Sequence, residues 1–386
     1  MAPKPFTVAI SDDDIVDLHQ RLDRTRWPDQ LNTSDWAYGT DLATLQALVH
    51  YWRHDFDWRQ QEAALNRYNH FTLAFDGLTT HFIHQRSPHA NATPLLINHG
   101  WPGSIVEFLD VLPRLLEPEK YGGRVEDAFH VVAPSLPGYA FSEAAKSPGM
   151  HTRAIAERHS KLMALLGYDS YLCQGGDWGA MITRQLADLD PQHCKGVHFN
   201  MLLAGPPADG DPMAGVSEQE RQRLQGDAAF AKEGMGYYKL QATRPQTLGY
   251  GLNDSPVGLC AWLTEKFYSW TDCDGDIRNA VSWDRLLTNI SLYWFTQSIT
   301  SSTRLYYEHR RHKDTVQRVK LPTGATIYPG ELVRPPRAWA EASYNLIHWF
   351  EAEKGGHFAA LEQPQVFAEE LWRFAQALQT RGDLPA

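Results

Sequence analysis

The spacing of apolar residues changes near residue 70. Before that point, apolar side chains recur every three or four residues over 15–22, behind the candidate N-cap Ser11, and again over 42–52. This spacing puts them on one face of a helix. Residues 1–70 are therefore predicted to form a helical N-terminal module.

From residue 71 the period falls to two. The runs "FTLAF" and "THFIHQ" flank Asp76-Gly77, a pair typical of a β-hairpin turn. Short apolar runs then alternate with stretches of helical spacing. Strands are predicted at 94–98, 129–134, 171–174 and 196–202, and helices near 104–116, near 152–166 and after residue 177. This alternation predicts a mostly parallel central sheet flanked by helices.

The alternation is interrupted between about 205 and 310. Gly, Pro and Asp are frequent there at first, and aromatic-rich helical segments such as "LLTNISLYWFT" follow. Strand patterns return at 324–329 and 346–351, before a final helix at 364–378. The chain is therefore expected to be an α/β protein divided into an N-terminal module (1–70), a core in two parts (71–204 and 311–386) and an inserted helical cap (205–310).

Charge and cysteine content exclude several classes of protein. The net charge is −10 and the basic residues are scattered, which argues against binding to nucleic acid. The four cysteines form no CxxC pair, and no apolar run reaches about 18 residues. We expect a cytoplasmic protein without a membrane anchor, a disulfide framework or a zinc site. The "DCDGDI" segment lacks the spacing of a calcium loop, because Ile277 stands where glycine is required, and is predicted to be a solvated turn.

The stretch Gly175-Gly176-Asp177-Trp178-Gly179 fits the G-x-nucleophile-x-G elbow between a strand and a helix. In that turn small residues let the central side chain stand clear of the sheet. Asp177 is thus a candidate nucleophile. The simpler interpretation is a glycine-rich turn in which the aspartate caps the helix.

A second segment, His99-Gly100-Trp101-Pro102, directly follows the predicted strand at 94–98. An α/β-hydrolase places there the loop that supplies one oxyanion donor. The backbone N–H groups of Trp101 and Trp178 are the predicted donors. His99, Gly100 and Pro102 are predicted to line the substrate pocket, although such a loop can also be an ordinary turn.

His357, preceded by two glycines near the end of the chain, is the candidate general base. Glu331 follows the strand at 324–329 and is the candidate acid that orients it. Taken singly, His357 could be a structural residue and Glu331 a solvated loop residue. Their order after Asp177, nucleophile then acid then histidine, favours the catalytic interpretation.

These motifs carry a family resemblance over nearly the whole length. With "LDRTRWPD", "HGWPGS", "GGDWG" and "GGHFAALEQP", the chain resembles the microsomal-type epoxide hydrolases of the α/β-hydrolase fold superfamily. The resemblance implies two cap tyrosines that bind the epoxide oxygen, and they match Tyr237 in "YYKLQATRP" and Tyr306 in "SSTRLYY". The neighbours Tyr238 and Tyr307 are the alternatives. Unlike the vertebrate members, the chain is expected to have no membrane anchor.

The implied reaction needs only side chains and water. Asp177 would attack an apolar epoxide while Tyr237 and Tyr306 donate to its oxygen, and water activated by His357 and Glu331 would then hydrolyse the ester to a vicinal diol. No cofactor or metal is required. The expected partners are the epoxide and water, and a homodimer is a reasonable expectation.

Two other functions remain open from the sequence. A haloalkane dehalogenase uses the same elbow aspartate and could bind halide through the indoles of Trp101 and Trp178. A departing halide needs no proton donor, so the tyrosine pair favours the epoxide. A catalytically inactive hydrolase-fold protein that binds a ligand is the alternative of another class. A serine esterase is not expected, because the elbow has no hydroxyl.

Overall fold

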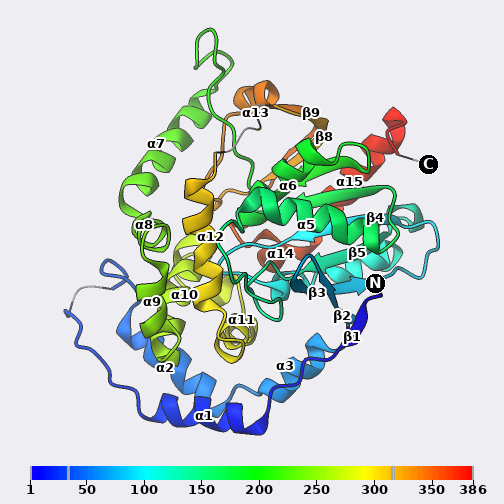
Figure 1. Cartoon of the computed structure of the whole chain (residues 1–386). Helices are drawn as coiled ribbons and strands as arrows, with labels where there is room; N and C mark the ends of the chain where they lie inside the picture. The colour runs from blue at the N-terminus through cyan, green and yellow to red at the C-terminus, as the bar shows by residue number, and fades with distance from the viewer. Residues whose placement is uncertain (1, 33–34, 314–315, 317, 385–386) are drawn as a thin grey trace.

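A computed structural model describes residues 2–32, 35–313, 316 and 318–384. Among these residues, nine strands form one sheet in the order β1-β2-β3-β5-β4-β6-β7-β8-β9 (Figure 1). They are β1 (Lys4–Phe6), β2 (His70–Phe75), β3 (Leu78–Gln85), β4 (Thr93–Asn98), β5 (Phe129–Pro134), β6 (Tyr171–Gly175), β7 (Cys194–Phe199), β8 (Val319–Ile327) and β9 (Tyr344–Glu351). The first three strands pair antiparallel and the last six pair in parallel. The mostly parallel sheet is thus confirmed.

Helices pack on both faces of the sheet, since its central strands are apolar on both sides. In β4, Leu95 and Ile97 enter one core and Leu96 the other, as the period of two requires. The first core is closed by α4 (Leu112–Leu116) and α15 (Pro364–Arg381), and the second by α5 (Thr152–Leu165) and α6 (Asp177–Leu189). Shorter elements complete the core region: α13 (Arg337–Ser343), α14 (Ala359–Glu362), and the 3-10 turns η2 (Pro118–Tyr121) and η3 (Val125–Asp127).

The single helix predicted near 104–116 was wrong. The segment forms a 3-10 turn, η1 (Ile105–Phe108), and a separate short helix, α4. Pro113 lies in the first turn of α4, where its missing N–H costs nothing, but it could not sit inside one continuous helix. The break matters for the active site because η1 turns back beside the loop that begins at His99.

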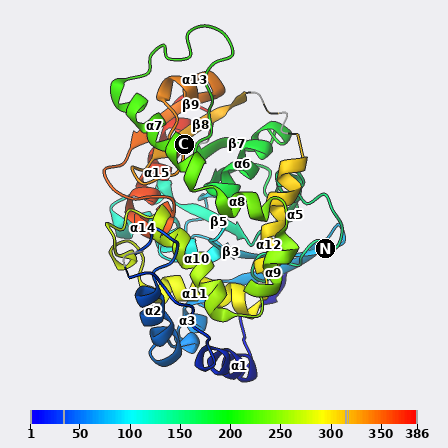
Figure 2. The same cartoon turned by 90° about the vertical axis from the view of Figure 1, so that its left-hand side faces the viewer.

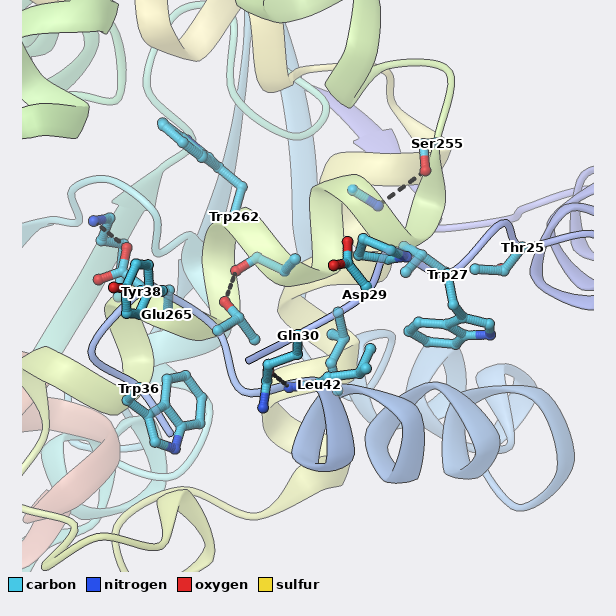
Figure 3. A pocket seen from close by; sticks show the side chains of 18 of the residues that line it. Thr25, Trp27, Asp29, Gln30, Trp36, Tyr38, Leu42, Ser255, Trp262 and Glu265 are labelled. Atoms are coloured by element: carbon cyan, nitrogen blue, oxygen red, sulfur yellow. Dashed lines mark hydrogen bonds and ion pairs between the residues drawn. The ribbon is translucent and has the colours of Figure 1, made fainter. Parts of the chain in front are cut away.

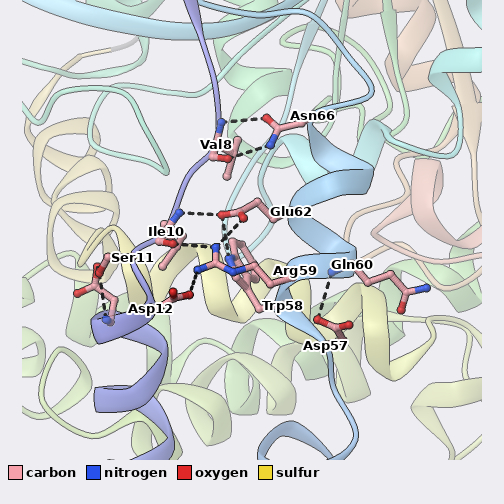
Figure 4. A network of polar contacts seen from close by, with 11 residues as sticks. Val8, Ile10, Ser11, Asp12, Asp57, Trp58, Arg59, Gln60, Glu62 and Asn66 are labelled. Atoms are coloured by element: carbon pink, nitrogen blue, oxygen red, sulfur yellow. Dashed lines mark hydrogen bonds and ion pairs between the residues drawn. The ribbon is translucent and has the colours of Figure 1, made fainter.

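The N-terminal module contains α1 (Asp12–Asp23), α2 (Leu42–His54) and α3 (Trp58–Leu65), together with strand β1, which the helical pattern did not predict. The Ser11 side chain caps α1 by accepting the N–H of Asp14 at 3.1 Å. The segment between β1 and α1 is held by polar contacts to α3 and its C-cap Asn66 (Figure 4). The Asn66 side chain accepts the N–H of Val8 and donates to the carbonyl oxygen of Val8. The Glu62 carboxylate accepts the N–H of Ile10 at 2.7 Å.

The cap lies between β7 and β8 in the chain. It consists of α7 (Glu218–Glu233), α8 (Gly236–Gln241), α9 (Pro245–Leu252), α10 (Pro256–Trp270), the 3-10 turn η4 (Ile277–Asn279), α11 (Trp283–Phe295) and α12 (Ile299–Arg311). Helices α1 and α2 pack against α10, and α3 packs against α11 (Figures 1 and 2). The Trp52 indole, for example, donates to the Ser291 hydroxyl at 3.1 Å. The N-terminal module therefore supports the cap.

Two further properties bear on the expectations from sequence. The four cysteines are free, buried thiols. Across the described ranges, none of the helices combines the length and the apolar composition needed to cross a bilayer.

Candidate active site

Asp177 stands at the turn between β6 and α6, as the elbow pattern predicts. Its φ of +49° lies in the left-handed region, which is uncommon for a residue with a side chain. The glycines around it permit this close turn. A Cβ on Gly176 would lie 2.4 Å from Nδ2 of Asn200, and one on Gly179 would lie 2.0 Å from the carbonyl oxygen of Asn98. The carboxylate is thereby placed at the N-terminus of α6, where the helix favours an anion.

The loop after β4 approaches this carboxylate with its backbone. The Trp101 N–H donates to Oδ1 of Asp177 at 2.8 Å, and a Cβ on Gly100 would lie 2.2 Å from the same oxygen. The Trp178 N–H lies in the first turn of α6, where N–H groups have no partner within the helix. The structure thus brings both predicted oxyanion donors to the elbow.

His357 and Glu331 meet Asp177 from the other side. Nε2 of His357 lies 3.3 Å from Oδ2 of Asp177, and its Nδ1 lies 2.7 Å from Oε1 of Glu331. Both residues are only 4% exposed. Burial lowers the pKa of His357, but the charges and hydrogen bonds of Glu331 and Asp177 outweigh it and raise that pKa well above its ordinary value. The imidazole is therefore held between two carboxylates.

Contacts with the end of α10 hold the His357 loop against the cap. The carbonyl oxygen of Trp270 accepts the His357 N–H at 2.8 Å, and the indole lies edge-on to the imidazole with ring centroids 5.1 Å apart. Asp272, predicted to be part of a solvated turn, is exposed but accepts the N–H of Gly355 at 2.9 Å. Sequence spacing gave no sign of this contact.

Tyr237 on α8 and Tyr306 on α12 are both buried against Trp101. Their ring centroids lie 5.5 Å and 5.7 Å from the Trp101 ring. Burial raises the pKa of both phenols well above the ordinary value, and the charge of Asp177 raises both further. Both hydroxyls therefore stay protonated and can donate.

The neighbouring tyrosines differ in their surroundings. Tyr238 and Tyr307 are only half-buried, and the Arg311 guanidinium lies 3.3 Å from the centre of the Tyr307 ring. Within the described part of the chain, the buried hydroxyl of Tyr306 makes no hydrogen bond. The geometry therefore favours Tyr237 and Tyr306 as the pair that faces the elbow.

The predicted pocket residues in the oxyanion loop have different surroundings. Nδ1 of His99 lies 3.0 Å from the carbonyl oxygen of Gly100, and its Nε2 lies 3.2 Å from the N–H of Leu136. Burial lowers the pKa of His99 to about 4, so the ring is neutral. Its two nitrogens bond to the backbone groups of Gly100 and Leu136. The carbonyl of Pro102 accepts from Asn289 at 2.7 Å. Gly100 lines a small cavity beside Asp177.

Two titratable side chains near this site were missed by the sequence reasoning. Lys266 on α10 is 5% exposed, and its Nζ lies 4.5 Å from the centre of the Tyr237 ring. Glu107 on η1 lines the same small cavity as Asp177 and His357. Neither was assigned a role from the sequence, although each interrupts an apolar stretch, which was the available signal.

A larger cleft of about 1270 Å³ reaches the cap side of the site. It lies between the segment that links α1 to α2 and the cap helices α8 and α10, and Trp27, Trp36 and Trp262 border it (Figure 3). Tyr237 and Lys266 also line it. The cleft thus connects the surface with one of the two site tyrosines.

Comparison with known proteins identifies the family. Residues 3–108 match the family described as the epoxide hydrolase N terminus, and residues 93–248 match the α/β-hydrolase fold. Epoxide hydrolase 1 of Oryctolagus cuniculus is 39% identical, over 96% of this chain and 88% of its own. The chain belongs to the epoxide hydrolase family.

Solved epoxide hydrolase structures share the whole architecture. The juvenile hormone epoxide hydrolase of the silkworm Bombyx mori has a TM-score of 0.92 at 33% identity, covering 99% of this chain and 96% of its own. The Aspergillus niger epoxide hydrolase has a TM-score of 0.88 at 32% identity, covering 97% and 96%. The predicted α/β-hydrolase fold with its cap and N-terminal module, and the predicted enzyme class, are both confirmed.

Proposed function

We propose that this epoxide hydrolase opens an apolar epoxide through a covalent ester of Asp177 and then hydrolyses that ester to a vicinal diol. One observation carries the proposal. The two oxygens of the Asp177 carboxylate have different partners: Oδ1 accepts the Trp101 N–H, whereas Oδ2 faces His357. A nucleophile that must later be released needs this arrangement, because one oxygen is to be stabilised as an oxyanion and the ester is to be attacked by activated water.

The first step uses Asp177 and the tyrosines. Oδ2 attacks an sp3 carbon of the epoxide, and the electrons of the breaking C–O bond move to the epoxide oxygen. Tyr237 and Tyr306 donate to that oxygen as its negative charge develops. Their raised pKa values suit this role, because both phenols are protonated and neither brings a second negative charge to the site.

The second step uses His357, Glu331 and the backbone donors. His357 removes a proton from water, which attacks Cγ of Asp177, while Glu331 stabilises the imidazolium. The resulting oxyanion on Oδ1 is stabilised by the N–H groups of Trp101 and Trp178. Removing one such donor typically costs about 3–4 kcal/mol of barrier.

The aromatic part of the cleft wall supports an apolar substrate. Exposed apolar side chains stand along its border, with Leu31 60% and Tyr38 81% exposed. Its aromatic walls lead to Tyr237, where the epoxide oxygen would be held. Charged residues line the cleft as well, among them Arg24, Asp29 and Glu265, so the aromatic surface forms only part of its wall.

A dehalogenase activity is the second candidate, because the indole nitrogens of both Trp101 and Trp178 are buried without a partner among the described residues. The two activities are separated by offering a terminal aryl epoxide and a bromoalkane in parallel. We expect diol from the first and no halide from the second. Halide release at a comparable rate would favour the dehalogenase.

The covalent step is tested with His357→Gln. This variant should alkylate normally but fail to hydrolyse, so that mass spectrometry finds the mass of the epoxide added to the peptide that contains Asp177. Asp177→Ala is the control and should give no adduct. Full turnover by His357→Gln with an unmodified Asp177 would disprove the assignment.

A further inference from the structure

Glu107 lies on η1, four residues after the end of the His99–Gly103 loop, and the mechanism above gives it no role. Together with Asp177 and His357 it lines an internal cavity of about 10 Å³. A bound water needs roughly 10–15 Å³ of such space. The cavity therefore has room for about one water molecule next to the nucleophile and the base.

The walls of this cavity carry further polar side chains. Asn98, Gln174 and Asn200 also line it. The Nε2 of Gln174 donates to Asn200 at 2.7 Å, but among the described residues Oε1 of Gln174 and Oδ1 of Asn98 are buried without a hydrogen-bond partner. Since buried polar atoms are nearly always bonded to protein or water, these acceptors indicate a water site.

Glu107 is suited to bind water without adding charge. Burial, helped by the charge of Asp177, raises the pKa of Glu107 to about 8, although His357 and the N–H groups of Gly100 and Ser104 act in the opposite direction. The carboxyl is therefore mostly protonated at neutral pH. A neutral carboxyl can hold water beside Asp177 without repelling the oxyanion that forms there.

We propose that this cavity, which we call the water chamber, holds the hydrolytic water, and that Glu107 positions this water between Nε2 of His357 and Cγ of the Asp177 ester. The inference rests on the covalent mechanism proposed above. The C=O oxygen of the protonated Glu107 side chain accepts one water hydrogen in a hydrogen bond. His357 accepts the other hydrogen as a proton. The water oxygen bonds to Cγ, and the carbonyl electrons move to Oδ1. The tetrahedral intermediate then collapses, the Cγ–Oδ2 bond breaks, and Oδ2 leaves with the diol, taking the proton from His357.

A second buried carboxyl provides a control. Burial raises the pKa of Glu362 to about 7, and this carboxyl also interacts with the charge of His357. Its oxygens accept the N–H groups of Asp272 at 2.8 Å and Phe358 at 3.0 Å, and, unlike Glu107, Glu362 does not line the water chamber. Glu362→Gln therefore tests whether any buried carboxyl near His357 with a raised pKa would have the same effect.

The experiment separates the two chemical steps by rapid quench with a terminal aryl epoxide, measuring formation and decay of the ester on Asp177. Glu107→Gln and Glu107→Met form a matched pair of similar length, one able to bond water and one apolar. We expect both to form ester within about threefold of the unmodified enzyme, which also shows that they fold. Glu107→Gln should hydrolyse the ester within about fivefold of the original rate, whereas Glu107→Met should be at least tenfold slower and accumulate ester.

The outcomes discriminate between the possibilities. Hydrolysis by Glu107→Met at the original rate, equal slowing in both variants, or the same selective slowing in Glu362→Gln would each overturn the role of Glu107. Glu107→Ala gives the same comparison if the methionine side chain prevents folding. If instead no ester forms even in His357→Gln, the covalent mechanism itself fails, and that result is distinct from the failure of the water chamber.

Discussion

Nε2 of His357 lies 3.3 Å from Oδ2 of Asp177, so the base of the second step contacts the nucleophile of the first. This contact links the two steps electrostatically. As long as Asp177 is a carboxylate, it raises the pKa of His357 together with Glu331. When Asp177 becomes a neutral ester, its part of this effect is lost, and the imidazole can more readily take up its role as a base.

The pH dependence of ester hydrolysis follows from this relationship. Hydrolysis needs neutral His357, so its rate should rise with pH and level off above the pKa of the imidazole in the ester state. Glu331 still raises that pKa, so Glu331→Gln should move the midpoint to lower pH. Stopped-flow measurement of ester decay across pH checks this. A midpoint that moves to higher pH would contradict the assignment of Glu331.

The fate of the attacking oxygen gives a second prediction. In a single turnover in 18O water, the label should appear in the Asp177 carboxylate, because the first diol carries away the original Oδ2. Mass spectrometry of the peptide that contains Asp177 and of the diol measures both. Later turnovers should then release label into the diol. Label in the diol from the first turnover would mean that water attacks the epoxide directly.

The tyrosine pair gives a third prediction. Tyr237→Phe and Tyr306→Phe should each slow ester formation by roughly 10- to 100-fold, and the double variant should lose about 10⁴-fold, because a general acid is typically worth 10²–10⁴. Ester hydrolysis should change little in the single variants. Tyr238→Phe and Tyr307→Phe are the matched controls, since their rings are only half-buried. A larger loss in these controls would show that Tyr238 and Tyr307, rather than Tyr237 and Tyr306, donate to the epoxide oxygen.

The sequence predicted the parts of the site that depend on local pattern. The elbow around Asp177, the loop at Trp101 and the position of His357 follow from short motifs beside strands, and the sheet places their strand ends together. Glu107 could not be predicted in the same way. Its role depends on η1 turning back toward Asp177, and the helical spacing of that segment had predicted one longer helix. Strand β1 was missed because its three residues are too few to set up a period.

Contacts between segments that are far apart in the chain could not be predicted from the sequence either. Asp272 and Gly355 are 83 positions apart, and their hydrogen bond depends on how the end of α10 meets the loop before His357. The helical spacing around Lys266 is equally compatible with a position on a face exposed to solvent. Only the packing of α8 against α10 brings its charge to the Tyr237 ring.

Lys266 leads to the last prediction. A cation over an aromatic face is attracted to the ring, and here it should make the Tyr237 hydroxyl a better donor to the opening epoxide. Lys266→Met should slow ester formation by roughly 3- to 30-fold, as about 0.5–2 kcal/mol of interaction implies, and leave ester hydrolysis unchanged. The double variant with Tyr237→Phe checks the route of the effect. If the charge acts through the hydroxyl, Lys266→Met should cause little further loss once that hydroxyl is gone. Equal losses in both backgrounds would show instead that Lys266 only supports the packing of the cap.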